Sequence, residues 1–450
     1  MTEAWLAGQR AAFAACRGAL PGAGTPWVDA LRAQAFRQFE EDGPPSPRIE
    51  EWRSGPTAAL TGQVFAPTAP DGARPASVPA PYLAGPRHRL VFVDGRFSAE
   101  HSDPGEPPTG ARLTSLGTLL AEDPAAAREL VGDPEAFAEE RLSLVTDRRP
   151  QALVALNTAL ASDGAVLIVD DGVALPHPVE VVYLARAATD PSAHHLRTLI
   201  ALGAGARANV VEVHAGGSGS VWTNHVTETA LGDGARLEHV RADAGTRSAV
   251  RVDVAHARLH AGAAYAGFVM AGNTGAVRTE TRLVLEGAGA DGEINGLCLA
   301  GGASHIDALT RLDHRAREGT SRQLWRGVFG DEARGAFQGR IRVLSGASGT
   351  NAALDNRNLL LSTGARTESK PELEILTDDV ACSHASATGQ LDGDALFYLR
   401  SRGLSERMAR AVLMEAFAGA VVDRIADDGV RAFVRRLVDD QLNVLGSTAS

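Results

Sequence analysis

A short glycine-containing turn recurs at nearly constant spacing through the middle of this 450-residue chain. Each copy follows an apolar run and precedes another, and the copies lie at 203–206, 232–235, 260–263 and 287–290. Their central glycines are Gly205, Gly234, Gly262 and Gly289. A near-constant period of roughly 30 residues with a turn at one phase is typical of stacked coils, each of which buries its inward side chains on the next. The repeat therefore predicts a β-solenoid, with a β-sandwich of repeated hairpins as the alternative.

The runs between these turns alternate apolar and polar residues as short β-strands do. We expect strands at 165–169, 179–185, 196–202, 209–214, 221–231, 338–344, 358–361 and 373–377. Glycine suits the corner between two strands because it adopts a tight bend without a steric penalty. The spacing indicates stacking and leaves the handedness of the solenoid open.

Helical spacing replaces this pattern in the N-terminal part of the chain. We expect helices at 3–20, 25–42, 113–123 and 134–160, a proline-rich linker at 67–86, and a hairpin at 90–97 that turns at Asp94-Gly95. Thr25 and Pro26 suit the N-cap and the first turn of the second helix. The expected organisation is mainly β with flanking helices: an N-terminal helical region with its linker and hairpin over 1–160, a β-solenoid core over 161–385 and a C-terminal helical domain over 386–450.

Three amphipathic helices are expected after the core. Asp392 caps the first, at 393–402, Gly403 ends it, and Ser405 begins the second. The apolar stripe of the second helix comprises Met408, Val412, Leu413, Ala416, Phe417, Ala420 and Val421. The stripe of the third, at 429–445, comprises Val430, Phe433, Val434, Leu437, Val438 and Leu442. Such helices can cover the open end of a solenoid or offer a face to another protein.

Charge and hydropathy exclude several classes of function. The net charge of −11 argues against a nucleic-acid surface, which needs clustered Lys and Arg. No apolar run approaches the roughly 18 residues of a membrane span. The N-terminus lacks the basic region and apolar core of a signal peptide, so a bacterial-type cytoplasm is the expected location.

The motif Cys382-x-His384 is the strongest candidate for chemistry. On an extended backbone, residues two apart share a face, so the thiol and the imidazole can act together. These two groups suit iron or zinc but make only half of a metal site, and two packing residues at a strand end would have the same pattern. The other cysteines, Cys16 and Cys298, are far away, so the three thiols form no disulfide framework and cannot supply the four thiolates of a stable cubane cluster.

The residues around this motif resemble a known family. The run DDVxCSH at 378–384 continues into GQLD, ALFYLRSRG and SERMARAVLMEAF, and upstream agreement lies at 90–97, 155–160, 337–341, 358–362 and 370–375. This pattern resembles the SufB/SufD family of scaffold subunits of the SUF iron–sulfur cluster assembly system. The likeness spans most of the chain and is densest over 335–420. It departs at 385–388, which reads Ala-Ser-Ala-Thr where the family usually has Gly-Ala-Thr-Val.

The resemblance implies a right-handed parallel β-helix and a non-catalytic scaffold rather than an enzyme. It implies that His384 is functional at an interface with the homologous subunit SufB, and that His384 and Cys382 contact a transient iron–sulfur cluster shared with SufB. Asp378 or Asp379 could fix the tautomer of His384. No stable cofactor is expected in the isolated chain. SUF scaffolds are also associated with reduced flavin, for which this chain has no motif.

The resemblance also implies a second partner. The ATPase SufC would dock on the C-terminal helices around 400–417, through Arg400, Arg402, Met408 and Phe417. The SufB branch carries a cysteine in the strand aligned near 356–360, and this chain has none there, which favours the SufD branch and a sulfur-receiving thiol supplied in trans. Whether the isolated chain forms a homodimer is left open.

Other candidate residues have weaker patterns. His256, His260, the pair His194-His195, and His314 beside Asp313 lack zinc spacing, and Cys16 and Cys298 lie in apolar surroundings. No phosphate-binding G-x-x-x-x-G-K-[ST] occurs, so the chain itself is not expected to hydrolyse ATP. The alternative function is a β-helix carbohydrate-active enzyme (a polysaccharide lyase or hydrolase). It needs paired carboxylates in an aromatic-lined groove, whereas this chain has 5% aromatic residues and no clear acid pair.

Overall fold

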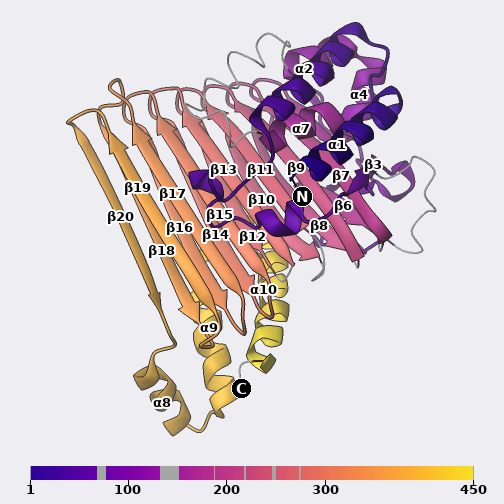
Figure 1. Cartoon of the computed structure of the whole chain (residues 1–450). Coiled ribbons are helices and arrows are strands. Elements are labelled where there is room, and N and C mark those ends of the chain that lie inside the picture. Colours follow the sequence, from indigo (N-terminus) through magenta and orange to yellow (C-terminus); the bar gives the residue numbers. More distant parts are fainter. Residues whose placement is uncertain are drawn as a thin grey trace.

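The β core consists of two ten-stranded sheets that lie face to face (Figure 1). The computed structural model describes residues 2–67, 78–131, 152–186, 188–216, 219–245, 250–272 and 275–448. The first sheet contains β1 (Ala66–Pro67), β4 (Ala111–Ser115), β5 (Ala165–Val169), β7 (Ala188–Leu202), β9 (Gly219–Leu231), β11 (Val250–Leu259), β13 (Ala276–Leu285), β15 (His305–His314), β17 (Arg334–Val343) and β19 (Arg366–Ile375). The second sheet contains β2 (His88–Val93), β3 (Arg96–Phe97), β6 (Val179–Ala185), β8 (Arg207–Gly216), β10 (Arg236–Gly245), β12 (Ala264–Ala271), β14 (Asp291–Ala300), β16 (Thr320–Phe329), β18 (Thr350–Leu360) and β20 (Val380–Gly389).

From β5 onward, consecutive strands alternate between the two sheets, and each strand pairs in parallel with the second strand after it. The order is β5-β7-β9-β11-β13-β15-β17-β19 in the first sheet and β6-β8-β10-β12-β14-β16-β18-β20 in the second. Only a stacked coil gives this connectivity, so the prediction of a parallel β-solenoid is confirmed. The hairpin of β2 and β3 is also confirmed, with positive φ at both Asp94 and Gly95.

The recurrent glycines lie at the corners that lead from the first sheet to the second. Gly205, Gly234, Gly262 and Gly289 all have φ between 63° and 69°. The next corner along the chain has Glu318 at φ 61°, and the one after it has Gly349. The solenoid thus continues beyond the repeat that the glycines mark, because a non-glycine residue can occupy one left-handed corner at a modest energetic cost.

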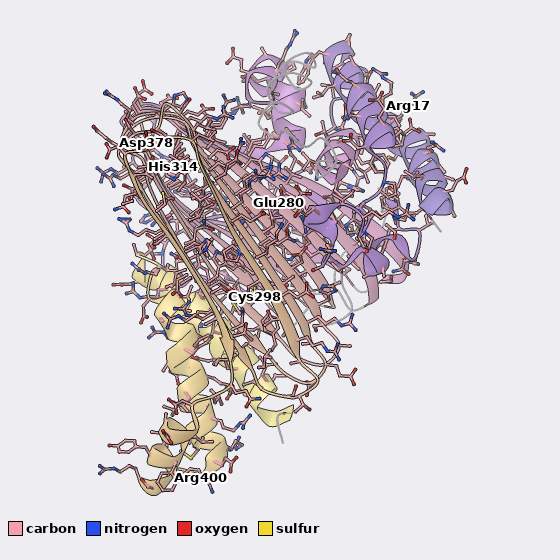
Figure 2. All side chains as sticks on the ribbon, turned by 60° about the vertical axis from the view of Figure 1, so that its left-hand side comes forward. Arg17, Glu280, Cys298, His314, Asp378 and Arg400 are labelled. Atoms are coloured by element: carbon pink, nitrogen blue, oxygen red, sulfur yellow. The ribbon has the colours of Figure 1, made fainter. Side chains whose placement is uncertain are left out.

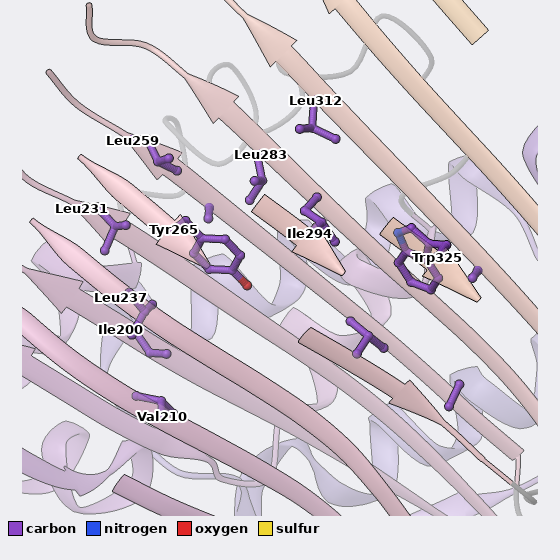
Figure 3. Packing of buried hydrophobic residues seen from close by; sticks show 14 of the residues in the cluster. Ile200, Val210, Leu231, Leu237, Leu259, Tyr265, Leu283, Ile294, Leu312 and Trp325 are labelled. Atoms are coloured by element: carbon purple, nitrogen blue, oxygen red, sulfur yellow. The ribbon is translucent and has the colours of Figure 1, made fainter. Parts of the chain in front are cut away.

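The interior of the solenoid holds the largest apolar cluster. Inward-facing residues of successive coils stack in columns: Leu259 lies opposite Leu231 on one side, a pair that Figure 3 labels, and opposite Leu285 on the other. Trp325 is the bulkiest side chain of this cluster and contacts Phe337 at a ring-centroid distance of 5.3 Å. Gly296 lies beside Trp325 on the neighbouring strand, where a Cβ atom would come within 2.3 Å of the indole.

The N-terminal helices cover the outer face of the first sheet. They are α1 (Thr2–Cys16), α2 (Pro26–Asp42), α3 (Thr57–Thr61), α4 (Leu116–Glu122), α5 (Pro124–Val131) and α7 (Ala152–Leu160). Trp5 and Phe39 pack here on Trp222 and Val252 of the sheet. Of the expected linker at 67–86, residues 68–77 lie outside the described part of the chain, as do 134–151 of the expected helix at 134–160.

One expected helix begins later than its sequence pattern indicates. Residues 111–115 form strand β4, which pairs antiparallel with β5, and α4 follows. Ser115 divides the two elements because its hydroxyl accepts the N–H of Thr118 and caps the helix. The backbone groups of residues 111–114 instead form hydrogen bonds with the edge strand β5 of the sheet.

Three C-terminal helices follow the solenoid: α8 (Gly393–Ser401), α9 (Glu406–Val422) and α10 (Asp428–Thr448). The predicted caps Asp392 and Ser405 are confirmed. Helices α9 and α10 pack on the outer face of the second sheet, for example Phe433 near Phe268 and Met270. Helices α9 and α10 therefore do not cover the open end of the solenoid, which was one of the two possibilities that the sequence left open, because they pack on the apolar outer face of β8 to β16.

The stripe predicted for α9 is largely wrong, whereas that of α10 is confirmed apart from a half-buried Leu437. Met408 and Val412 are 55% and 42% exposed, while the buried face comprises Ala409, Met414, Ala418, Val421 and Val422. Helix α9 carries two apolar faces, and the one with small alanines packs against the sheet because it allows a close approach. No helix among the described residues is long and apolar enough to cross a membrane.

Candidate functional site

The last strand of the second sheet, β20, carries both residues of the Cys-x-His motif. Among the described strands it pairs in the sheet with β18 alone, and its other edge is open. Cys382 lies opposite Ala352, and His384 lies opposite Leu354. Ala352 and Leu354 are buried in the interior cluster. Because paired residues of a sheet share a face, Cys382 and His384 lie on the interior face of the last coil, where no further described coil covers them.

The position of β20 at the end of the stack determines how far the side chains of Cys382 and His384 are exposed. Cys382 is half-buried against the interior cluster, and His384 is exposed. Burial raises the pKa of the Cys382 thiol, so the thiol is protonated at neutral pH until a metal or a base displaces its proton. The exposed imidazole offers a nitrogen lone pair to an incoming metal ion. The thiol and the imidazole are candidate ligands of different softness, and they lie at a surface that another chain can reach.

The two acids that precede β20 do not reach His384. Figure 2 shows Asp378 at the corner of the solenoid where β20 begins. Asp379 stands five residues before His384 on extended backbone, which separates their Cα atoms by roughly 16 Å. A carboxylate that fixes the tautomer of His384 would therefore have to come from elsewhere.

The second candidate surface lies on α8 and the start of α9, beyond the other end of β20 (Figure 2). Large side chains here face solvent: Phe397 is 74% exposed, Tyr398 56% and Met408 55%. Arg400 is exposed and forms an ion pair with Glu406 at 3.4 Å, and the guanidinium of Arg402 lies 5.2 Å from the ring of Tyr398.

Of the predicted docking residues, Phe417 has different surroundings. It is half-buried beside the second sheet, with the guanidinium of Arg326 5.6 Å from its ring. Three of the four predicted docking residues, Arg400, Arg402 and Met408, are therefore available to a partner, whereas Phe417 mainly anchors the helix.

Comparison with known families decides the class of protein. The family model of the SUF system FeS cluster assembly SufBD core domain matches residues 184–417, from β6 into α9. The chain belongs to the SufBD family. The chain is 27% identical to the iron–sulfur cluster assembly protein SufD of Escherichia coli over 421 residues, covering 91% of this chain and 92% of the relative. It is 28% identical to an iron–sulfur cluster assembly SufBD family protein of Synechocystis over 406 residues, covering 88% and 86%.

A third relative matches a shorter part of the chain. The SufD protein of Bacillus subtilis is 28% identical over 284 residues, covering 62% of this chain and 64% of that protein. Both the β20 motif and most of α8 and α9 fall inside the region that the SufBD family model matches.

Several histidines and cysteines of this SufBD protein had sequence patterns that did not favour a ligand role, and in the structure they are buried structural groups. His194 and His195 are buried, and burial lowers the pKa of His195 to about 3. His314 is buried and bonds Ser321, and burial raises the pKa of the Cys298 thiol to about 12.

A groove on the first sheet bears on the alternative function of a carbohydrate-active enzyme. Its lining includes Glu50, Glu374, Lys370 and Arg340 and contains no aromatic residue among those described. Lys370 bonds Glu50 and Arg340 bonds Glu374, and these bonds lower the pKa of both carboxyls. A glycosidase needs an acid whose pKa is raised, so this groove does not favour that function.

Sequence reasoning missed a polar group of side chains inside the first coils. Glu212, His214, His225, His239 and Asp253 face one another there, and none is more than 5% exposed. Their spacing along the chain resembles no metal motif. The repeat length of the coils could have identified this group from the sequence, because it places Asp253 one coil after His225, on the neighbouring strand of the same sheet.

Proposed function

We propose that this SufBD protein is the SufD-type scaffold subunit of iron–sulfur cluster assembly. Its open end pairs with the homologous subunit SufB, and His384 and Cys382 bind the nascent cluster, which is cargo shared between the two chains. The observation that carries the proposal is the position of both side chains on the interior face of an uncovered last coil.

The edge of β20 suits a partner of the same architecture. An edge strand presents unpaired N–H and C=O groups that another chain can bind. Next to it, Ile375 and Leu376 are 41% and 53% exposed, which adds apolar area at the same end. A second solenoid covering this end would bury these side chains and bring its own ligands towards Cys382 and His384.

The remaining ligands and the sulfur come from other chains. Cys298 is buried inside the solenoid and Cys16 lies on α1, so neither reaches β20. The chain therefore supplies one thiol and one imidazole, and SufB supplies the thiol that receives sulfur.

The ATPase SufC binds the exposed surface of α8 and α9. Arg400, Arg402 and Met408 lie on this surface beside Phe397 and Tyr398. The loop between Gly389 and Gly393 connects β20 directly to α8, so motion of the helices acts on the strand that carries the ligands. ATP-driven closure would then open and close access to the cluster site, which is a gating role rather than chemical catalysis.

The test is His384→Ala in the chain co-expressed with its SUF partners and purified without oxygen. We expect the complex to assemble, while its iron and acid-labile sulfide fall by about tenfold because a direct ligand is lost. Cys382→Ala should lower both contents as well. Iron and sulfide analysis with absorbance spectra gives the readout.

The matched control is His260→Ala. His260 is an exposed histidine at another corner of the same solenoid and should keep full cluster content. A normal cluster yield from His384→Ala would refute the proposed role of β20, and loss of the complex in His260→Ala would show that the assay reports folding instead.

A further inference from the structure

Three ligating side chains meet in the interior of the solenoid, far along the chain from β20. They are His214 on β8, His225 on β9 and Asp253 on β11. Their ligand atoms all lie within 4.8 Å of one another, and the residues are 5%, 0% and 0% exposed. Two sheets contribute, because β8 belongs to the second sheet and the other two strands to the first.

The register of the solenoid creates this meeting point. Asp253 lies directly opposite His225 on the neighbouring coil. Residues on either side of Asp253, Val252 and Val254, face the outer helices, so Asp253 faces inward. His214 approaches the same point from the opposite sheet.

Two of the three distances between ligand atoms fit one metal ion. His214 Nε2 lies 3.1 Å from His225 Nδ1, a hydrogen bond whose proton a metal ion would displace, and His225 Nδ1 lies 3.6 Å from Asp253 Oδ1. Bonds of about 2.1 Å put two ligands about 3.0 Å apart at a right angle and about 3.4 Å apart at the tetrahedral angle. The second distance is too long for a hydrogen bond. Asp253 Oδ1 has no hydrogen-bond partner among the described residues, which is costly for a buried carboxylate.

The surroundings hold these side chains in orientation. His225 Nε2 lies 2.9 Å from Thr198 Oγ1, which Tyr183 also bonds. If His225 Nε2 carries the proton and donates it to Thr198, Nδ1 is left with a free lone pair that points at the other two ligands. Arg241 Nη1 lies 2.9 Å from Asp253 Oδ2 and so turns Oδ1 towards the imidazoles.

Charged side chains surround this point. Among the described residues, Asp253 contacts Arg241 and Arg251, Asp243 contacts Arg251, and Glu212 lies 3.3 Å from His239. Burial lowers the pKa of both His214 and His225, so both rings are neutral. Burial raises the pKa of Asp253, but the two guanidiniums outweigh it and keep the carboxylate ionised. Neutral imidazole and carboxylate are the protonation states that a metal requires.

We propose that His214, His225 and Asp253 bind a divalent transition-metal ion, Zn²⁺ or Fe²⁺, inside the first coils, with water in the remaining positions. Two imidazoles and one carboxylate are a known ligand set for both ions. The site joins the two sheets across the interior, and it does not depend on the proposed cluster function. Its ligands are nitrogen and oxygen only, which separates it from the Cys382–His384 pair.

The test measures metal in the untagged full-length chain produced with zinc or, without oxygen, with iron. We expect about one ion per chain that resists a chelator in the folded protein and is released on unfolding, because the ligands are fully buried. X-ray absorption of the metal that remains after the chelator has removed any ion at Cys382 and His384 should show nitrogen and oxygen neighbours and no sulfur. Less than about 0.1 ion per chain with either metal, or a sulfur neighbour, would overturn the site.

Variants locate the ion. His225→Gln and Asp253→Asn should each lose most of the metal, whereas Cys382→Ala and His384→Ala should retain it. His314→Gln is the matched control, because His314 is an equally buried histidine on a distant coil. Metal retained in folded His225→Gln would overturn the assignment. If His225→Gln does not fold, the X-ray absorption spectrum of the unmodified chain still decides between the proposed ligand set and a sulfur-containing one.

Discussion

The covered coils and the open last coil place the same kind of residue in opposite surroundings. His239 and His384 belong to one inward-facing column, which runs from Val210 through His239, Gly267, Ile294, Gln323 and Leu354 to His384. His239 is 0% exposed, with Nδ1 2.9 Å from the hydroxyl of Tyr265 and Nε2 3.3 Å from Glu212. His384 is exposed at the end of the stack.

The difference between these histidines comes from neighbours rather than from the residue or its strand position. A coil on each side gives His239 fixed hydrogen-bond partners and removes it from solvent. The missing coil beyond β20 leaves His384 free to meet another chain. In a solenoid the terminal coil is therefore the natural place for an interaction site, because the same inward column that builds the core becomes surface there.

The largest expected effect on stability is the difference between a substitution in the interior and one at the open end. Trp325→Ala should lower the free energy of unfolding by about 3–5 kcal/mol, because it leaves a large cavity beside Phe337 and Gly296. Ile375→Ala at the open end, where the side chain is 41% exposed, should cost less than about 1 kcal/mol. Urea unfolding followed by circular dichroism measures both. Equal losses would mean that the two ends are packed alike.

A smaller effect concerns pH. Burial lowers the pKa of His314 to about 4, against an ordinary value of 6.5. The neutral ring is favoured in the folded state, so its contribution is complete above pH 6.5 and is lost as the pH falls from 6.5 towards 4. The loss amounts to as much as about 3 kcal/mol for this shift. Unfolding free energies measured at several pH values in this window test it.

One variant tests this assignment. His314→Asn should reduce the pH dependence of stability between pH 4 and 6.5, even if it lowers stability at neutral pH through loss of the bond to Ser321. An unchanged slope in His314→Asn would contradict a neutral, buried ring.

The sequence predicted the fold where local and repeated signals agreed. The near-constant spacing of the corner glycines identified the stacking, and the caps Asp392 and Ser405 placed two helices. The prediction failed where the sequence pattern allowed two local structures or two helix faces, and tertiary packing determined which of them formed. Residues 111–115 joined the edge of the first sheet instead of extending α4, and α9 buried its alanine face instead of Met408 and Val412.

The candidate site divides in the same way. Alternation on an extended strand correctly placed Cys382 and His384 on one face, since that depends only on the two-residue period. Their exposure could not be predicted, because it depends on which coil is last. The group formed by His214, His225 and Asp253 was missed because its members come from three strands, and only the register between coils brings them together.

The substitution with the smallest expected effect on stability lies at the open end, and the same substitution should strongly weaken association with a partner. Leu376 follows β19 and is 53% exposed, so Leu376→Asp should change the free energy of unfolding by less than about 0.5 kcal/mol. If a SufB-type solenoid covers this end, the aspartate becomes buried beside apolar groups and should weaken the complex by about 2 kcal/mol or more, roughly thirtyfold in affinity. Val64→Asp places the same charge at a position that is 44% exposed on the N-terminal side and should leave affinity unchanged. Titration of the purified chains by calorimetry measures both. Equal affinities of the two variants would show that the partner binds another face, and that the exposed column ending at His384 is not an interface.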